Sequence, residues 1–329
     1  MKFFQRKKES SLAKKLLENE DIHINKLRVT IYQNGIVPEE EEVIRGDVWK
    51  LFLNFYPPQR SQWDKIDILL HKDYLTFLSD FFPAEKQTVT ENTKEMDTLL
   101  LYEIDKDVNR LFPKESFFVN EKNKEAIRHI LYVQTKFNKT CPYVQGMNDI
   151  AGILFYAFSQ SLPKERAEST AYYCFAYLMT RISDWFSPKH DNTPRGIHAQ
   201  LDRIDKIMEM KEPEIYEHLQ KVNINNTLYL FRWVTLLFAQ EFPIDKVLLI
   251  WDCILCDSTN DFICCFAVSM VAEIKKQLLS SDFSGCLKLL QKYPSSIDVH
   301  TILKRARLYY ADRMNFPRPS SPTTFQSPK

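Results

Sequence analysis

Apolar residues recur at helical spacing along almost the whole of this chain. One stripe occupies a single helix face at positions i, i+4, i+7, i+8 and i+11: Ile44, Val48, Leu51, Phe52 and Phe55. No stretch alternates apolar and polar residues for long, and the chain has only six glycines, too few for a sheet with many tight turns. The sequence therefore predicts an all-α fold.

Proline, glycine and asparagine residues divide this pattern into separate helices. The expected ranges lie near 44–55, 100–111, 127–137, 147–158, 164–185, 195–211, 214–221, 227–240, 245–256, 262–279, 284–292 and 299–314. The polar stretch 83–97 is expected to be a connecting loop. Helices of such varied length do not suit a simple repeat array, and 329 residues can form two packed helical lobes.

Charge and cysteine usage exclude some classes of protein. The chain has 44 Lys and Arg against 43 Asp and Glu, which gives no electrostatic reason to expect a nucleic-acid partner. Most of the seven cysteines lie in apolar helical stretches, so we expect small buried hydrophobes in a reducing compartment. Cys253 and Cys256 have no second ligand pair nearby, which weighs against a metal site.

The two ends differ from the rest of the chain in composition. Residues 1–24 form a basic N-terminal segment, residues 25–312 are the expected folded domain, and 313–329 are expected to be a disordered Pro/Ser/Thr-rich tail. For the basic segment, a solvated first helix is favoured over a transient contact of apolar residues such as Leu16 and Leu17 with an anionic membrane.

Nothing in the sequence indicates export or a membrane span. The N-terminal segment lacks a continuous apolar core, and the longest apolar stretch, 262–272, is too short to cross a bilayer. We therefore expect a soluble, cytoplasmic protein.

The run Ile104-x-x-Asp107-x-x-Arg110 ends a predicted helix with an arginine. Asp107 and Arg110 are three residues apart, so their side chains share a helix face. One interpretation is a surface ion pair with a cation near the helix C-terminus. The other is that Asp107 holds Arg110 in a preset rotamer, directed outward to a phosphate oxygen.

The run Tyr143-x-Gln145-Gly146-Met147 precedes the next long helix. A glutamine beside a glycine can simply be a helix cap. Alternatively, Gly146 permits a positive φ or a close backbone approach while Tyr143 anchors the turn. Such a loop would hold the Gln145 amide rigidly above a partner's surface.

Arginine and glutamine are the two side chains that hydrolysis of a nucleoside triphosphate recruits most: the first neutralises charge and the second orients water. The chain nevertheless has no G-x-x-x-x-G-K-[ST] run, and no two of its glycines form a G-x-G. We therefore expect Arg110 and Gln145 to complete the active site of another protein.

Together these motifs resemble those of the TBC-domain activators of Rab GTPases. Further markers follow in that family's order: Gly35-Ile-Val-Pro38, Ile44-Arg45-Gly46-Asp-Val-Trp49, Phe231-Arg232-Trp233 and Ile250-Trp251-Asp252. The resemblance covers residues 27–310 and looks closest to the branch called TBC domain family member 13. Two departures are Val37 within the G-I-P element and the short connection between the two finger motifs, where that branch tends to carry a long insert.

The resemblance implies a Rab-GAP TBC domain over residues 25–312 that accelerates GTP hydrolysis in trans. It assigns Arg110 as an arginine finger and Gln145 as a glutamine finger. Four residues would support them: Ile104, Asp107, Tyr143 and Gly146. No cofactor is expected in this chain, because GTP and Mg²⁺ would belong to the GTP-bound Rab, which would also recruit the protein peripherally to endomembranes.

Two other functions stay open. The first is a catalytically inactive TBC-like scaffold that binds Rabs, although the presence of both fingers weighs against it. The second is an all-α metal phosphohydrolase, suggested by His190 and Asp191. That chemistry needs several ligands on packed helices, whereas this pair lies in a predicted loop and the other histidines show no ligand spacing.

Overall fold

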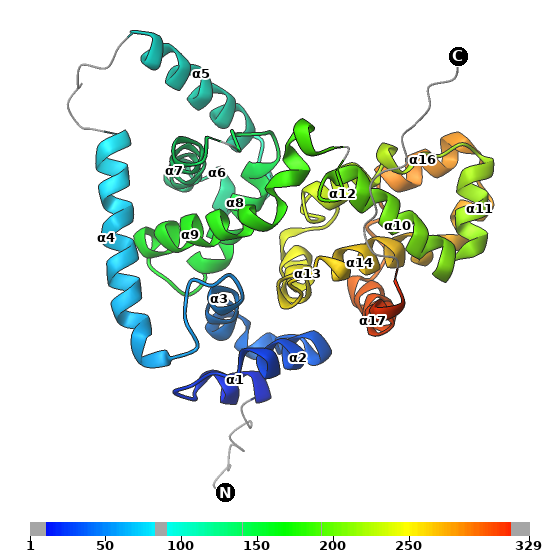
Figure 1. Ribbon diagram of the computed structural model, residues 1–329, viewed down its shortest axis with the longest axis horizontal. Coiled ribbons are helices and arrows are strands. Elements are labelled where there is room, and N and C mark those ends of the chain that lie inside the picture. Colours follow the sequence, from blue (N-terminus) through cyan, green and yellow to red (C-terminus); the bar gives the residue numbers. More distant parts are fainter. Residues whose placement is uncertain (1–10, 83–90, 140, 192, 317–329) are drawn as a thin grey trace, which may run out of the picture.

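The chain folds into two helical lobes that lie side by side (Figure 1). The computed structural model describes residues 11–82, 91–139, 141–191 and 193–316, with the backbone alone for 91–95. Over these residues no β-strand forms, and one isolated antiparallel bridge joins Asp21 and Gln59. The predicted all-α fold of two packed lobes is confirmed.

The first lobe is centred on α7, α8 and α9, which contact one another, while α4 and α5 lie on its outside (Figure 1). Its helices are α1 (Leu12–Leu17), α2 (Ile24–Asn34), α3 (Glu41–Phe52), α4 (Trp63–Phe81), α5 (Glu91–Val108), α6 (Ser116–Val119), α7 (Glu121–Phe137), α8 (Met147–Ser159) and α9 (Lys164–Ile182). Short 3₁₀ helices are η1 (Pro38–Glu40), η2 (Arg60–Gln62), η3 (Ser183–Phe186) and η4 (Pro188–His190).

The second lobe is arranged around α14, which contacts α10, α12, α13 and α17. Its helices are α10 (Ile197–Lys211), α11 (Pro213–Lys221), α12 (Leu230–Thr235), α13 (Ile244–Cys256), α14 (Asp261–Glu273), α15 (Lys275–Leu279), α16 (Phe283–Gln291) and α17 (Val299–Ala311). The 3₁₀ helices η5 (Asn226–Leu228) and η6 (Arg313–Asn315) complete it.

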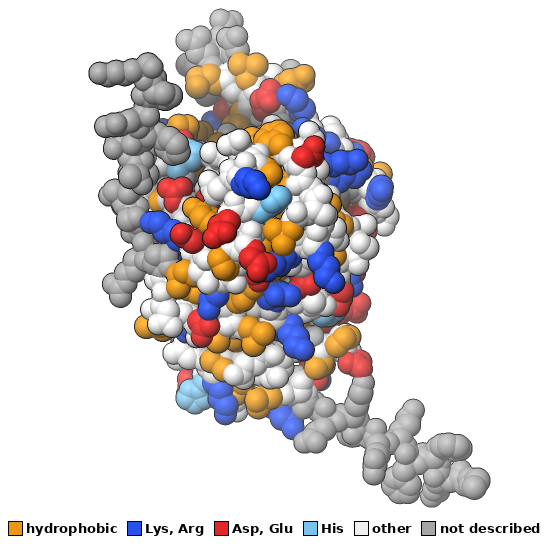
Figure 2. Space-filling view, turned by 90° about the vertical axis from the view of Figure 1, so that its right-hand side faces the viewer, with side chains coloured by type: hydrophobic (Ala, Val, Ile, Leu, Met, Phe, Trp, Pro, Cys, Tyr) orange, Lys and Arg blue, Asp and Glu red, His pale blue; other side chains and the backbone are white. Residues whose placement is uncertain are grey.

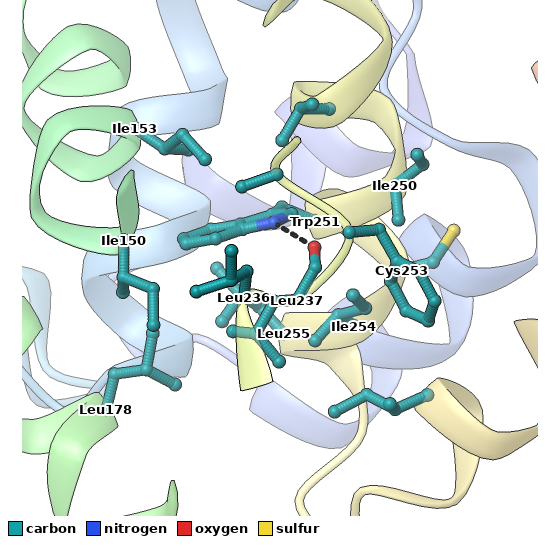
Figure 3. Close-up of a cluster of buried hydrophobic side chains, with 14 of the residues drawn as sticks. Ile150, Ile153, Leu178, Leu236, Leu237, Ile250, Trp251, Cys253, Ile254 and Leu255 are labelled. Atoms are coloured by element: carbon teal, nitrogen blue, oxygen red, sulfur yellow. Dashed lines mark hydrogen bonds between the residues drawn. The ribbon is translucent and has the colours of Figure 1, made fainter. Parts of the chain in front are cut away.

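Helix α13 connects the two lobes, because it contacts α2, α3 and α8 of the first lobe as well as α14 and α17 of the second. Figure 3 shows its Trp251 among side chains from both lobes, including Ile150 and Leu178 from the first. The indole Nε1 donates to the Leu237 carbonyl at 3.0 Å, so this fully buried ring leaves no unpaired donor.

A buried polar cluster also fixes α3 against α13. The Arg45 guanidinium donates to both oxygens of the Asp252 carboxylate, at 3.0 Å from Nε and 3.0 Å from Nη2. The Trp49 indole donates to the same carboxylate at 2.8 Å. These three side chains are buried and hold the lobes together.

Two predictions for the first lobe were incomplete or wrong. No helix was predicted where α4 forms, although Trp63, Leu70, Tyr74 and Phe81 pack inward from one of its faces. The predicted loop 83–97 is wrong from residue 91 onward, because α5 begins at Glu91. The Asp97 carboxylate accepts a 2.8 Å bond from Lys136 Nζ on α7, so this polar part of α5 is tied to the lobe through charge.

Two predicted helices of the second lobe are interrupted. The range 227–240 is helical only over η5 and α12, because Leu237 and Phe238 take left-handed backbone conformations with φ of 49° and 63°. The range 262–279 is divided at Ile274 into α14 and α15. The first interruption has a tertiary cause: the Trp251 indole binds the Leu237 carbonyl, and the Phe238 N–H donates to the Trp233 carbonyl at 2.8 Å.

Both ends of the described chain pack more closely against the fold than predicted. A helix forms in the basic segment as expected, but one of its faces is buried and not solvated. Helix α1 buries Leu16 and Leu17 against the core, which removes them from any membrane contact. Residues 313–315 form η6 and Phe316 is buried, so the predicted disordered tail is wrong for these four residues. The rest of both end segments, and residues 83–90 of the predicted loop, lie outside the described residues. The domain boundaries stay predictions.

The surface of the second lobe mixes both signs of charge. Figure 2 shows acidic and basic side chains interspersed with small apolar areas on that face. In the described part of the chain, no helix combines the length and the apolar character that a bilayer crossing requires.

Candidate functional site

Arg110 lies just beyond the C-terminal end of α5. The helix ends at Val108, and the Arg110 N–H donates to the Asp107 carbonyl at 3.3 Å in a tightened last turn. The opposite face of α5 is anchored in the core by Ile104, which is fully buried. The Arg110 side chain is 52% exposed, so it stands at the surface on a fixed base.

Asp107 joins the segments of the two predicted fingers. Its buried carboxylate accepts a 2.5 Å bond from Arg110 Nη2 on one oxygen and a 2.6 Å bond from the Tyr143 hydroxyl on the other. The contact between Asp107 and Arg110 was predicted from their spacing and is confirmed. Burial and the bond to Asp107 raise the pKa of Tyr143 well above its usual value, so this hydroxyl keeps its proton and acts as donor.

Gly146 meets two requirements that only glycine satisfies. Its φ is 103°, a conformation that other residues rarely adopt, and an added Cβ would lie 2.3 Å from Leu236 Cδ2. The chain can therefore turn into α8 while its backbone lies directly against the second lobe. The predicted close approach at Gly146 is confirmed.

Gln145 is exposed, whereas Gly146 and Met147 after it are buried. The Met147 N–H donates to the Val144 carbonyl at 3.1 Å and closes the turn around Gln145. Tyr143, two residues earlier, is bonded to Asp107. The Gln145 amide is thus presented at the surface from a loop that is fixed on both sides and attached to the base of Arg110.

Asn148 was not predicted as part of the site. Its side-chain oxygen accepts from the Gly146 N–H at 3.1 Å, and its amide nitrogen approaches the Asp107 carbonyl at 3.4 Å. An amide suits this place because it offers an acceptor to one segment and a donor to the other. The sequence signal was present but unused: a polar residue directly after the motif, in the first turn of an otherwise apolar helix.

Asp149 and Gln240 extend the cluster into the second lobe. Burial raises the pKa of the Asp149 carboxyl to about 6, while a bond from the Gln240 amide and the charge of Arg110 oppose that rise. Gln240 Nε2 lies 3.2 Å from Asp149 Oδ1. No sequence signal marks Gln240, because it is 91 residues away from Asp149.

The other candidate chemistry finds no comparable geometry. His190 Nδ1 lies 3.1 Å from an Asp184 oxygen, in the short 3₁₀ turns that follow α9. Among the residues that the structure describes, no three His, Cys, Asp or Glu side chains come together as metal ligands. All seven cysteines are buried and fill the core, as predicted. Burial also raises the pKa of the Cys253 thiol to about 11.

The arrangement of these motifs agrees with a comparison to known families. A model described as the Rab-GTPase-TBC domain matches residues 42–279, which include both finger segments and the helix that joins the lobes. This chain belongs to that family. The resemblance inferred from the ordered motifs is confirmed.

Relatives of this TBC domain differ in length. TBC1 domain family member 13 of Homo sapiens is 28% identical over an alignment of 384 positions, and the match covers 89% of this chain and 95% of that protein. TBC1 domain family member 5 of Mus musculus is 26% identical, and the match covers 90% of this chain but 44% of that protein. Among solved structures, the Ypt/Rab-GAP domain of Gyp1p superimposes with a TM-score of 0.77 at 20% identity, over 90% of this chain and 96% of that one. At that identity the likeness shows the fold.

Proposed function

We propose that this protein is a GTPase-activating protein for a Rab-family small GTPase and acts in trans on its GTP-bound form. The observation that carries the proposal is the Asp107 carboxylate, which bonds Arg110 on one side and Tyr143 of the Gln145 loop on the other. Membership of the TBC family supports it, as do relatives such as the GTPase-activating protein gyp7 of Schizosaccharomyces pombe.

Arg110 would act as the arginine finger. During GTP hydrolysis, negative charge develops on the transferring phosphoryl group and on the leaving phosphate oxygens. A guanidinium is always charged and can reach two oxygens at once through its planar fork. Fingers of this kind contribute about 10³–10⁵ in rate, or on the order of 4–7 kcal/mol of barrier. The bond to Asp107 fixes the rotamer before the partner arrives, so less entropy is lost on insertion.

Gln145 would act as the glutamine finger and orient the attacking water in place of the GTPase's own switch glutamine. An amide can accept a hydrogen bond from water and donate another to a phosphate oxygen, which fixes the line of attack. Ile104 would anchor the finger helix, Tyr143 would hold the loop, and Gly146 would set its direction.

The nucleotide and Mg²⁺ would be held by the Rab, so this chain would act as an activator without a cofactor of its own. Its attachment to endomembranes would follow from the same interaction, through a cytoplasmic protein recruited by a membrane-bound GTPase. Such a protein would regulate vesicle transport by ending the GTP-bound state of its Rab.

Single-turnover hydrolysis by a panel of GTP-loaded Rabs tests the proposal. We expect the wild-type protein to accelerate at least one Rab and Arg110→Ala to lose that acceleration by about 10³-fold or more. Arg305→Ala is the matched control, because Arg305 is a part-exposed arginine paired with Glu273 in the second lobe. A wild-type protein that binds GTP-loaded Rabs without accelerating any of them would instead be the inactive scaffold.

A further inference from the structure

The outer face of α5, the helix that ends two residues before Arg110, carries an exposed apolar stripe. The stripe consists of Met96, Leu99 and Tyr102, whose side chains are 72%, 60% and 65% exposed. The opposite face of the helix, with Ile104 and Val108, is buried in the lobe, and α5 contacts α7 and α8. The stripe therefore adds little to the core, and neighbouring exposed apolar side chains of this kind mark interaction surfaces.

The stripe continues along the helix to Arg110. Helical spacing places Leu99, Glu103 and Lys106 in one row at i, i+4 and i+7. Arg110 follows in the tightened turn just beyond the helix. At 1.5 Å per residue, Tyr102 lies about 12 Å and Leu99 about 16 Å from Arg110 along the axis. Between them is the exposed ion pair of Glu103 and Lys106, at 3.6 Å. An apolar area and an exposed charged pair thus lie on one side of α5, which ends two residues before Arg110.

We infer that Met96, Leu99 and Tyr102 form a docking surface for the same GTPase whose nucleotide Arg110 reaches, an inference that rests on the proposed function. A single domain of 100–150 residues has a radius of gyration of about 13–15 Å. A GTPase with its phosphates at Arg110 is therefore large enough to reach the last three turns of α5. The surface fits a partner that presents an apolar patch beside its nucleotide site, with charged groups that meet Glu103 and Lys106.

Leu99→Gln tests this surface, because the change removes the apolar side chain and keeps a good helix former. Covering one leucine contributes enough to binding that kcat/KM of the stimulated reaction should fall about tenfold or more. The loss should lie in KM, with kcat at saturating activator unchanged. In an Arg110→Ala background, binding to a Rab loaded with a non-hydrolysable GTP analogue should weaken by the same factor.

Leu308→Gln is the matched control. Leu308 is also a helical leucine, 65% exposed on α17 of the second lobe, and we expect this variant to behave as the wild type. If Leu99→Gln also matches the wild type while the wild type stimulates a Rab, the docking surface is rejected and the proposed function stands. If the wild type neither stimulates nor binds any Rab of the panel, both are rejected.

Two other occupants of the stripe would give different results. If Leu99→Gln lowers co-sedimentation with phosphatidylserine vesicles and leaves Rab stimulation unchanged, the stripe binds lipid and the inference is overturned. If light scattering shows that the wild type is a dimer and that Leu99→Gln is a monomer with unchanged stimulation, a second copy occupies the stripe and the inference is likewise overturned.

Discussion

At the scale of single residues, the chemistry of the site depends on how one carboxylate is shared. Asp107 is buried and holds an arginine from its own helix and a tyrosine from a loop 36 residues later. Because Arg110 and Tyr143 both bind the Asp107 carboxylate, this one group fixes the orientation of the Arg110 side chain and of the loop that carries Gln145. Such advance positioning is what a residue supplied to another protein's active site requires.

Replacing Arg110 with lysine should be almost as harmful as replacing it with alanine. Lysine keeps the charge but lacks the planar fork, so it cannot hold Asp107 and reach two phosphate oxygens in the same geometry. We expect stimulated hydrolysis to fall by about 10³-fold, with an unchanged thermal unfolding midpoint. Single-turnover measurements that show near-normal stimulation by Arg110→Lys would contradict the finger role.

Gln145→Ala should also abolish most of the stimulation. The Gln145 side chain is exposed and makes no contribution to the core, so the variant should fold normally. A loss of activity would then be due to the loss of the group that orients the attacking water. We expect a reduction of about 10²-fold or more, measured with a Rab whose own switch glutamine has been replaced. Full activity of Gln145→Ala on that Rab would exclude the water-orienting role.

Local spacing predicted part of the site and could not predict the rest. The pairing of Asp107 with Arg110 follows from a separation of three residues on a helix. The bond from Tyr143 to Asp107 and the place of Gln240 beside Asp149 depend on tertiary packing, which no local pattern encodes. The ordered motifs of the family directed attention to these two segments, and the structure then showed which of their atoms meet.

At the scale of elements, α10 carries a carboxyl that should make stability depend on pH. Burial raises the pKa of Asp205 to about 7, against an opposing bond from Asn226. Since the folded pKa lies above the unfolded one, the folded state binds more protons between about pH 4 and pH 7. The contribution of the Asp205 carboxyl to the free energy of unfolding is therefore fully present below this pH range and is lost as the pH rises through it.

Asp205→Asn should remove this loss. The amide stays neutral and its oxygen can still accept the bond from Asn226, which measures 2.8 Å. We expect the variant to be more stable than the wild type by about 1–2 kcal/mol at pH 8, after allowance for partial solvent screening. Urea unfolding at pH 4.5 and pH 8 checks this. The difference between the two proteins should be clearly smaller at pH 4.5, and an equal difference at both would disprove the titration.

Helix predictions succeeded where periodicity was strong and failed where tertiary contacts or charge decided the outcome. Helix α4 has a clear inward stripe that was overlooked among its charged residues. The first turns of α5 are polar and are held through charge, as the bond from Lys136 to Asp97 shows. The end of α12 could not be predicted, because Leu237 is held in a left-handed conformation by a hydrogen bond from the distant Trp251.

At the scale of the whole molecule, the ion pair of Arg45 and Asp252 should be the most sensitive contact between the lobes. Asp252→Ala would leave the Trp49 indole without its acceptor and the buried Arg45 guanidinium with the Glu41 carboxylate alone, at 3.3 Å. Breaking a buried pair in this way costs about 3–5 kcal/mol. Asp312→Ala, which breaks the exposed pair with Lys211, should cost less than about 1 kcal/mol. Urea unfolding that ranks the two variants equally would show that this cluster does not hold the lobes.

The same contact has a consequence for the order of folding. Arg45 and Asp252 are 207 residues apart, so α3 leaves the ribosome long before the helix that completes its packing. Contacts between residues so far apart in the sequence form late. Until then the apolar surface around Trp49 is exposed, where it can cause aggregation or bind chaperones. A chain interrupted before Ile244 would carry Arg110 and Gln145 and yet lack the helix against which α3 and α8 close. The lobe that carries Arg110 and Gln145 is synthesised first and completed last.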